Sequence, residues 1–467
     1  MENNDSVSRR SFMKSVGAGA AGLTIAGSGI DSVFAAPLAN TAWSNGMKIN
    51  DEIDNRKVVC CTDPEMFTNA AQANVANTFQ KQNAAVNTSR VEDNLDGMAM
   101  ALSGKNNVPD AWAAIFRKPS GKEWSAVKAA LKVNCIEVLN MHRVAIAGKI
   151  CKELIKLGVT PANITIYDAC HIASGNDKYT PYANGNGIPQ GVVVSSASRG
   201  STQVTVGSKT LGCTSVLVDQ SGQFVTDILV NCSVNKGHGQ TDKGGYTLSM
   251  KNHTGTFFKS GGGNCPTLQE MIDESKSDAI IGGTPPRQQL CVVDSLWATK
   301  GGPFGAVSHC PGSIAMGVFG PAVDVMVVRN IREKIMGATH NNSAIQTIVS
   351  SYGYSEGDFQ WIEVPPYIPT SLGRQTGKQQ TGEFIVVTAY KASAPVETRF
   401  SIPQDAVVRA EILAINGKVI RTLSNTAHAN RLVWDGRSSS GKHVNPGIYL
   451  IRITGVGFTR SQQVKLM

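Results

Sequence analysis

The sequence lacks the short motifs that mark the common enzyme classes. It has no Gly-x-x-x-x-Gly-Lys-Ser/Thr loop, no His-Glu-x-x-His helix and no Gly-x-Ser-x-Gly turn. Gly185, Gly187 and Gly191 do not fit the spacing of a dinucleotide-binding loop. These absences exclude the usual signatures of P-loop nucleotidases, zinc metalloproteases, α/β-hydrolases and dinucleotide-dependent oxidoreductases.

Cysteine pairs with the spacing of a metal site are also missing. None of the ten cysteines forms a Cys-x-x-Cys pair, which excludes the local signature of a zinc ribbon or a ferredoxin-type cluster. The chain therefore has no intrinsic iron–sulfur motif, and any cofactor is unknown. Cys135 and Cys291 lie in apolar runs, so we expect small buried hydrophobic residues, with disulfide pairing as the alternative.

Blocks of like charge and long apolar stretches do not occur either. The formal net charge is +9, but the basic residues form no cluster interleaved with aromatic residues, so we expect no nucleic-acid binding. The weakly apolar stretch at residues 16–30 is shorter than the roughly 20 apolar residues that span a bilayer. We therefore expect no transmembrane anchor.

The N-terminus carries a targeting pattern. Arg9 and Arg10 precede Ser-Phe-Met-Lys, the weakly apolar stretch follows, and Ala35-Ala36 ends a small-residue cleavage site. This pattern is a twin-arginine export signal over residues 1–36, so the twin-arginine translocase is a predicted partner and the predicted location is the periplasm or the cell surface. Because this route carries folded proteins, the signal favours a bound cofactor without naming one.

Two domains follow the signal. After a polar linker at 37–56, short apolar runs alternate with helical patterns over residues 57–364, which predicts an α/β domain with a mixed or mostly parallel sheet and flanking helices. Residues 365–382 read as a second linker, and 383–467 as a small all-β sandwich. Predicted strands include 129–138, 164–167, 224–234 and 289–293 in the first domain, with six further strands between 396 and 466; predicted helices include 93–102, 108–116, 142–157, 267–275, 322–335 and 344–351.

The C-terminal pattern resembles a known module. Its matching features are Asn416-Gly417, Trp434-Asp435-Gly436, Gly441, Pro446-Gly447 and Tyr449. Together they resemble the Ig-like domain of flagellar hook-capping proteins, and also the C-terminal sorting domains of type IX secretion. The resemblance implies an attachment or sorting role, with Trp434 and Tyr449 in the core of the sandwich.

Polar residues at the ends of apolar runs are the candidate site. Lys132 and Asn134 share one face of the predicted strand at 129–138, and Asp168 and Asp294 each follow a strand. In an α/β sheet, ligands bind at the carboxyl ends of the strands. A lysine in so apolar a run should be paired or functional, because an unpaired buried charge is costly.

A second group of candidates is cationic. Lys236 and His238 end another predicted strand, and Lys251 and Asn252 follow a short distance along the chain. We expect His238, Lys236 and Asp168 as candidate catalytic residues, and Lys132, Asn134, Lys251, Asn252 and Asp294 as ligand-binding residues. This mixture suits an anionic ligand or a metal-bound anion.

Structural roles remain open for several of these residues. Asp168 and Asp294 could instead be helix N-caps, and Lys236 and His238 could belong to an ordinary loop. Two adjacent pairs, Cys170-His171 and His309-Cys310, could join His238 in a zinc site, although no recognised ligand spacing is met.

The same strand ends also resemble a family. The matching elements are Lys-x-Asn at 132–134, Ile-x-x-Tyr-Asp at 164–168, Lys-x-His at 236–238, Lys251-Asn252, Val-Val-Asp at 292–294, Gly301-Gly302-Pro303 and Ala322-Val-Asp324. Over residues 85–365 they resemble domain-of-unknown-function family 362, some of whose members carry a ferredoxin-like cysteine cluster that this chain lacks.

These observations predict an exported protein whose α/β domain binds a cofactor, a metal or an anion, together with a C-terminal attachment or sorting module. Its ligand would be an anionic small molecule or an envelope component. The alternative is a non-catalytic envelope or surface binding protein. The sequence leaves open whether the protein is an enzyme.

Overall fold

The computed structural model divides the chain into two compact units, with the boundary after Tyr367. The predicted export signal lies outside the described residues, as does most of the predicted linker at 365–382. The structure describes residues 43, 46–69, 76–136, 139–168, 178–195, 202–258, 266–367, 396–399, 409–414, 418–424, 431–455 and 458–466.

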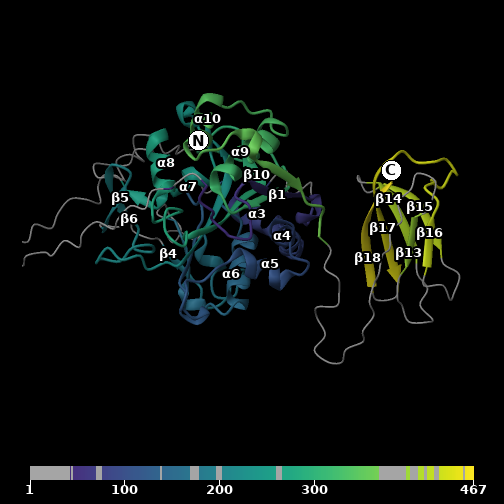
Figure 1. The fold of residues 1–467 in the computed structure, drawn as a ribbon, viewed down its shortest axis with the longest axis horizontal. Coiled ribbons are helices and arrows are strands. Elements are labelled where there is room, and N and C mark those ends of the chain that lie inside the picture. The colour runs from purple at the N-terminus through teal and green to yellow at the C-terminus, as the bar shows by residue number, and fades with distance from the viewer. Residues whose placement is uncertain are drawn as a thin grey trace, which may run out of the picture. The chain divides into compact units, whose positions relative to one another are not determined.

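A mixed sheet forms the centre of the first unit (Figure 1). Its strand order is β12-β1-β11-β10-β7-β2-β3-β4, and β8 pairs with β7 outside this path. Strands β10, β7, β2, β3 and β4 form a continuous parallel set, whereas β11 runs antiparallel to both β10 and β1. The bounds are β1 Lys57–Thr62, β2 Ala129–Lys132, β3 Ile164–Tyr167, β4 Val193–Ser195, β7 Ile228–Gly237, β8 Tyr246–Thr247, β10 Gln288–Thr299, β11 Ser313–Gly317 and β12 Gln360–Glu363.

Helices cover this sheet in two groups (Figure 1). Helix α4 packs on α5 and α6, whereas α7, α8, α9 and α10 pack on one another. The bounds are α3 Phe79–Ala85, α4 Thr88–Ser103, α5 Val108–Ile115, α6 Val144–Lys156, α7 Ser249–Asn252, α8 Leu268–Lys276, α9 Gly320–Val327 with a π-helical continuation Val328–Glu333, and α10 Asn342–Ser351. Single 3-10 turns lie at Pro64–Met66, Trp124–Ala126, Pro161–Asn163, Thr180–Tyr182, Thr241–Lys243, His253–Gly255 and Glu356–Asp358. The predicted α/β class with a mixed sheet is thereby confirmed.

Three strands of the sheet differ in their bounds from the prediction. Strand β7 begins at Ile228 and ends at Gly237, whereas the prediction was 224–234. Strand β2 ends at Lys132 rather than at residue 138, because the carboxylate of Asp168 takes the backbone N–H of Cys135 (2.6 Å) that a longer strand would use for pairing. Strand β10 continues to Thr299, six residues beyond the predicted end, and its residues Asp294 and Ser295 pair with β11.

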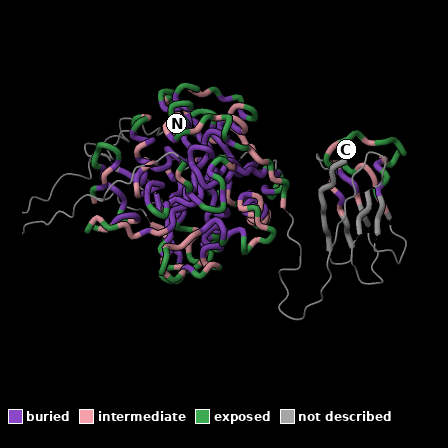
Figure 2. Tube along the Cα trace, viewed as in Figure 1, coloured by how far each residue is buried: buried purple, intermediate pink, exposed green. Residues whose placement is uncertain are grey.

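The core of the first unit extends into the segment predicted as a linker. Figure 2 shows the buried residues concentrated in the centre of this unit. Trp43 stacks on Phe319 with ring centroids 5.4 Å apart, and Ile49 and Ile53 are buried. The described residues between 43 and 56 are therefore part of the folded unit, since their apolar side chains have a place in its core.

A small antiparallel sheet lies apart from the main one. It has the order β5-β6-β9, with β5 Thr202–Val206, β6 Lys209–Cys213 and β9 Phe257–Phe258. Helix α8 packs against β5. The chain enters α8 through a capping box in which Thr267 and Glu270 bond reciprocally to each other's backbone N–H groups.

Two antiparallel sheets form the second unit. One pairs β13 (Val396–Arg399) with β16 (Arg431–Trp434); the other has the order β15-β14-β17-β18, with bounds Val419–Ser424, Arg409–Ala414, Gly447–Gly455 and Phe458–Leu466. Trp434 of the first sheet packs edge-on against Tyr449 of the second, with ring centroids 5.1 Å apart. This contact confirms the predicted small all-β sandwich and the core role of both rings.

The described cysteines are free thiols. Seven of the eight, all except Cys310, are buried, as expected for small hydrophobic side chains. Burial raises the pKa of the Cys151 thiol well above its usual range, so this thiol stays protonated and unreactive. Cys170 and Cys265 lie outside the described residues.

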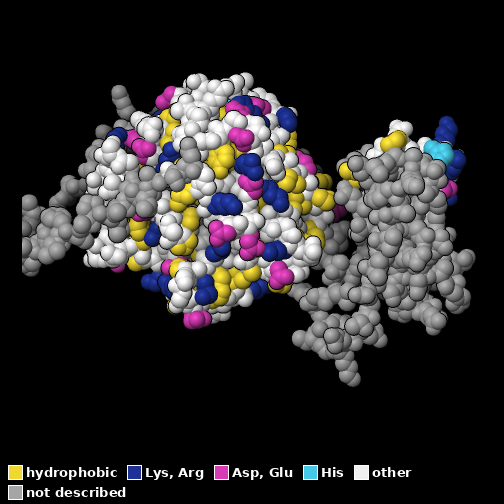
Figure 3. Space-filling view, in the orientation of Figure 1, with side chains coloured by type: hydrophobic (Ala, Val, Ile, Leu, Met, Phe, Trp, Pro, Cys, Tyr) yellow, Lys and Arg dark blue, Asp and Glu magenta, His cyan; other side chains and the backbone are white. Residues whose placement is uncertain are grey.

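The surface agrees with the charge pattern of the sequence. On the face of the first unit seen in Figure 3, lysine and arginine side chains alternate with aspartate and glutamate. Among the described residues, no helix combines the length and the apolar character that crossing a bilayer requires.

Glu274 on α8 gives a prediction about pH. Burial, followed by the charges of Glu270 and Asp273, raises the pKa of this carboxyl from 4.5 to about 8. The folded state then holds a proton that the unfolded chain releases, so Glu274 should make stability fall as pH rises from about 5 to about 8. We expect Glu274→Gln to raise the melting temperature at pH 8.5 and to leave it nearly unchanged at pH 4.5.

The exposed variant Glu123→Gln is the control, and it should not alter the pH profile. A Glu274→Gln variant that melts at the wild-type temperature at pH 8.5 would contradict the prediction. Part of the decrease of stability with rising pH should persist in Glu274→Gln. Burial also raises the pKa of Asp324, to about 7, which lowers stability as pH rises in the same way.

Candidate functional site

Five of the predicted site residues meet at the carboxyl ends of β2, β3 and β7. Lys132 ends β2 and Asn134 lies two residues further on. Asp168 comes directly after β3, and Lys236, the second-last residue of β7, pairs with Thr247 of β8. Asn252 reaches the same place from the last residue of α7. All five side chains are buried, with exposed fractions of 6% or less.

Lys132 and Asp168 form a buried ion pair. The ammonium of Lys132 lies 3.0 Å from Oδ1 of Asp168, and their side chains are 1% and 3% exposed. The same ammonium donates to the carbonyl of Val133 (2.8 Å) and to Oδ1 of Asn252 (3.2 Å). Three acceptors use all three protons of an ammonium group, so Lys132 ties the site together rather than offering a donor to a ligand.

Four amide side chains form a series of hydrogen bonds that begins at Lys236, and Lys132 donates into it at Asn252. Lys236 donates to Oδ1 of Asn134 (2.7 Å), and Nδ2 of Asn134 donates to Oδ1 of Asn252 (3.2 Å). Asn252 in turn donates to Oδ1 of Asn231 (2.9 Å), which donates to Oε1 of Gln288 (3.0 Å). We call Lys236, Asn134, Asn252, Asn231 and Gln288 the amide chain.

The amide chain also contacts a buried histidine. Nε2 of His253 lies 2.7 Å from Oε1 of Gln288, and Nδ1 lies 3.1 Å from Oγ1 of Thr256. Burial lowers the pKa of His253 to about 4, despite the hydrogen bond to Gln288. His253 is therefore neutral near pH 7 and belongs to the packed interior of the site.

Helix α7 is held in place by a buried carboxylate. Asp324 on α9 accepts the backbone N–H groups of Ser249 (2.7 Å) and Met250 (3.0 Å), which open α7. This bond pair satisfies donors that a helix start leaves unpaired. Asp324 thereby fixes the helix that carries Lys251 and Asn252.

The predicted residues His238 and Lys251 lie beside the amide chain, in and next to the hairpin between β7 and β8. Nδ1 of His238 accepts the backbone N–H of Gln240 (3.0 Å), and the ammonium of Lys251 donates to the side chain of the same Gln240 (2.9 Å). Burial, followed by the charges of Lys251 and Lys243, lowers the pKa of His238 to about 4. His238 is therefore neutral near pH 7, with its proton on Nε2.

Asp294 does not join these residues, contrary to the prediction. It lies inside β10 rather than at a strand end, and its carboxylate accepts the backbone N–H of Arg143 (2.7 Å), the residue that precedes α6. Nε of Arg143 lies 3.0 Å from the same carboxylate, and both side chains are fully buried. The alternative that Asp294 is a helix N-cap is also wrong, because Asp294 lies within β10 and the N-cap residue of α6 is Arg143; the carboxylate instead holds Arg143 by its backbone N–H and its guanidinium.

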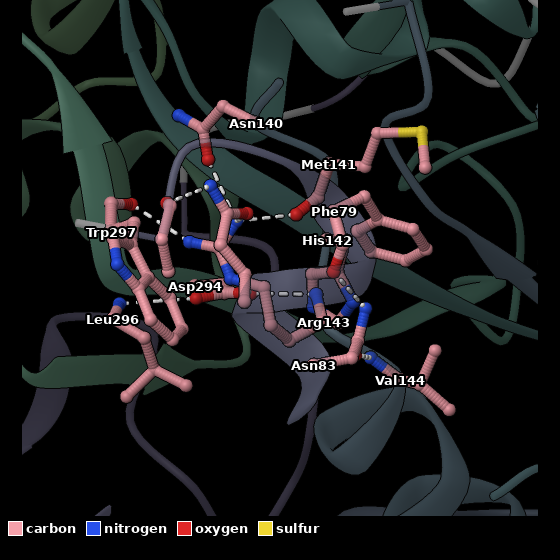
Figure 4. Close-up of polar contacts among 12 residues, drawn as sticks. Phe79, Asn83, Asn140, Met141, His142, Arg143, Val144, Asp294, Leu296 and Trp297 are labelled. Carbon is pink, nitrogen blue, oxygen red and sulfur yellow. Dashed lines mark hydrogen bonds and ion pairs between the residues drawn. The ribbon is translucent and has the colours of Figure 1, made fainter. Parts of the chain in front are cut away.

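Arg143 is the centre of this second cluster (Figure 4). Its guanidinium donates to Oδ1 of Asn140 (2.7 Å) and to the carbonyls of Met141 (2.5 Å) and Trp297 (2.9 Å), and it lies 5.0 Å from the centroid of the Trp297 ring. The cluster therefore fixes the loop between β2 and α6 to the end of β10.

The described residues offer no metal centre. They contain no group of three or more histidine, cysteine, aspartate or glutamate side chains placed to hold an ion. Of the pairs considered for zinc, Cys170-His171 lies outside the described residues. His309 instead lies 2.8 Å from the hydroxyl of Ser308 through its Nδ1.

A surface hollow of about 540 Å³ lies elsewhere on the first unit. It is lined by the segment that precedes β1, including Lys48, Asp51 and Arg56, and by Tyr354. No residue of the amide chain lines this hollow. Its charges are largely paired, as between Arg117 and Asp51 (2.6 Å).

Sequence reasoning missed several residues of the site. Asn231 and Gln288 lie in apolar strands, where a buried amide signals a hydrogen-bond network, and this signal could have been used. Lys243 and Arg143 carry no such signal, since their neighbours in space are distant in the sequence.

Comparisons with known proteins add little. No family model matches the chain, and no curated protein matches it. One solved structure, PorZ, is described as an essential bacterial surface component of the type-IX secretion system of human oral-microbiomic Porphyromonas gingivalis. It is 13% identical over 16% of this chain and 10% of that chain, with a TM-score of 0.14, an overlap too small to assign a fold or a function.

Proposed function

We propose that the first unit binds an anionic small molecule at the carboxyl ends of β2 and β7. The observation that carries the proposal is the position of Lys236, a fully buried cation at the end of β7; Lys251, on α7, is a second buried cation. Buried cations at strand ends suit an anionic ligand, since the protein has already met the cost of burying them.

The topology of the sheet supports this position. After β2 the chain passes through α6 to β3, whereas after β7 it passes through α7 and α8 to β10, on the other side of β7. Because β2 and β7 are neighbours, the strand order reverses between them. Ligands of open α/β sheets bind in the crevice outside such a reversal.

Export, sorting and family membership also belong to the proposal. We propose an exported protein with a twin-arginine signal, in which the C-terminal sandwich serves attachment or sorting, and a first unit related to family 362. Buried free thiols fit a chain that folds in a reducing compartment before export. A non-catalytic envelope binding protein would use the same anion site.

Calorimetric titration of the mature chain with phosphate, citrate and acetate tests the anion site. We expect at least one of these anions to bind, and Lys236→Met to weaken that binding at least tenfold, because the substitution removes the buried charge. Lys128→Met, an exposed lysine just before the amino end of β2, is the matched control and should bind as the wild type does. A wild-type chain that binds none of the three anions would contradict the proposal.

A further inference from the structure

We infer that Tyr367 and three residues of α4, Arg90, Asn94 and Gly97, form a latch that holds β12 on the sheet when the chain is pulled from its second unit. Residues 368–395 join Tyr367 to the first described strand of that unit. The inference rests on the attachment role proposed for the second unit, because an attached module passes mechanical load to the unit that it holds.

Strand β12 is the element of the first unit that such a load would reach first. It lies at one edge of the main sheet and pairs only with β1 among the described strands. Its four residues are partly buried or exposed, and none is fully buried. An edge strand with little buried surface opens at a lower cost in free energy than a central strand, so β12 without further support would peel from β1 early.

The backbone of Tyr367 is held at both of its polar groups. Its N–H donates to Oδ1 of Asn94 (2.8 Å), and its carbonyl accepts Nη1 of Arg90 (3.0 Å). Both partners lie on α4, and Asn94 is fully buried. These two hydrogen bonds fix the chain to a helix immediately before it leaves the first unit.

The same two residues of α4 are tied to the end of β1. Asp63, which follows β1, accepts Nδ2 of Asn94 (2.8 Å) and pairs with Nε of Arg90 (2.5 Å). Its carboxylate also caps the turn Pro64–Met66. A pull applied beyond Tyr367 therefore acts on α4 and on the end of β1 before it acts on the pairing of β12.

Gly97 makes room for the latch. A β-carbon at position 97 would lie 2.5 Å from Cβ of Tyr367 and 3.0 Å from its Cγ. Because Cβ is attached directly to the backbone, Tyr367 could not avoid this contact without moving the chain. Glycine is less favourable than alanine inside a helix, and the close approach of Tyr367 accounts for its presence within α4.

Stretching single molecules of the mature chain by their two ends in optical tweezers tests the latch. In the wild type we expect β12 to stay paired until the first unit unfolds as a whole. Gly97→Ala should displace Tyr367 and release residues 360–367 in a separate step at lower force, with a gain in length of at most about 29 Å. Asn94→Ala removes the acceptor for Tyr367 and is the second variant should Gly97→Ala fail to fold.

Gly148→Ala is the matched control. Gly148 lies on α6, and a β-carbon there would meet the carbonyl oxygen of Gly187, a contact that does not include Tyr367. We expect this variant to lower the force at which the first unit unfolds without adding the early step. Hydrogen exchange is a second readout: the Tyr367 amide should exchange at least tenfold faster in Gly97→Ala than in Gly148→Ala or the wild type.

Two outcomes would overturn the inference. If each folded latch variant extends in the same steps as the wild type, the latch carries no load. If Gly148→Ala shows the same early step, that step reports a general loss of stability. The attachment role fails by a different result: a chain without residues 383–467 that is still retained at the cell surface would refute that role and leave the force measurements unchanged.

Discussion

Replacing Asp294 by alanine should lower the free energy of unfolding by about 3–5 kcal/mol, as expected when one partner of a buried ion pair is removed. Arg143 would keep its charge in a fully buried position without the carboxylate 3.0 Å away. The variant also removes the acceptor for the backbone N–H that precedes α6. Urea unfolding followed by tryptophan fluorescence measures the change.

Glu52→Ala is the matched control for this prediction. It removes the ion pair between Glu52 and Lys105, whose side chains are 50% and 39% exposed, and solvent-exposed pairs contribute little to stability. We expect no measurable change in the urea midpoint. An Asp294→Ala variant as stable as Glu52→Ala would contradict the role assigned to the Arg143 cluster.

Gly237→Ala should disrupt the candidate site without removing any of its functional groups. A β-carbon at position 237 would lie 2.1 Å from the carbonyl oxygen of Lys300 and 2.6 Å from that of Gly301. Backbone atoms cannot move aside cheaply, so we expect a loss of about 1–3 kcal/mol or more in stability. Because Gly237 separates Lys236 from His238, anion binding should weaken as well.

Gly239→Ala is the control, since a β-carbon there meets nothing within 4 Å. The two alanine variants can be compared by urea unfolding and by hydrogen exchange of residues 299–303. Equal stability and equal exchange in both variants would show that the close approach of the two backbone segments is not required.

The sequence predicted the site better where chemistry is local. Lys132 sits in an apolar run, which correctly indicated a paired charge, and the Ile164–Tyr167 strand correctly placed Asp168 at its end. The six strands of the C-terminal unit were also predicted, because each is bounded by turn residues.

The features that the sequence did not predict depend on partners that are distant along the chain. Asp294 was predicted as a strand end because its apolar run stops at Val293, but pairing with β11 extends the strand. Arg143 and Asp294 are 151 residues apart, and a single sequence contains no signal that joins them. The same holds for Asp324 and α7, which meet across 75 residues.

The hydrogen bonds of the amide chain all run in the same direction. Each amide in it donates to the oxygen of the next, from Asn134 to Gln288, and the ammonium of Lys236 starts the series. A side chain that rotated alone would set two donors or two acceptors against each other on both sides. The two lysines that donate into the series, Lys236 at Asn134 and Lys132 at Asn252, therefore set the direction of the amides and keep them aligned as one unit.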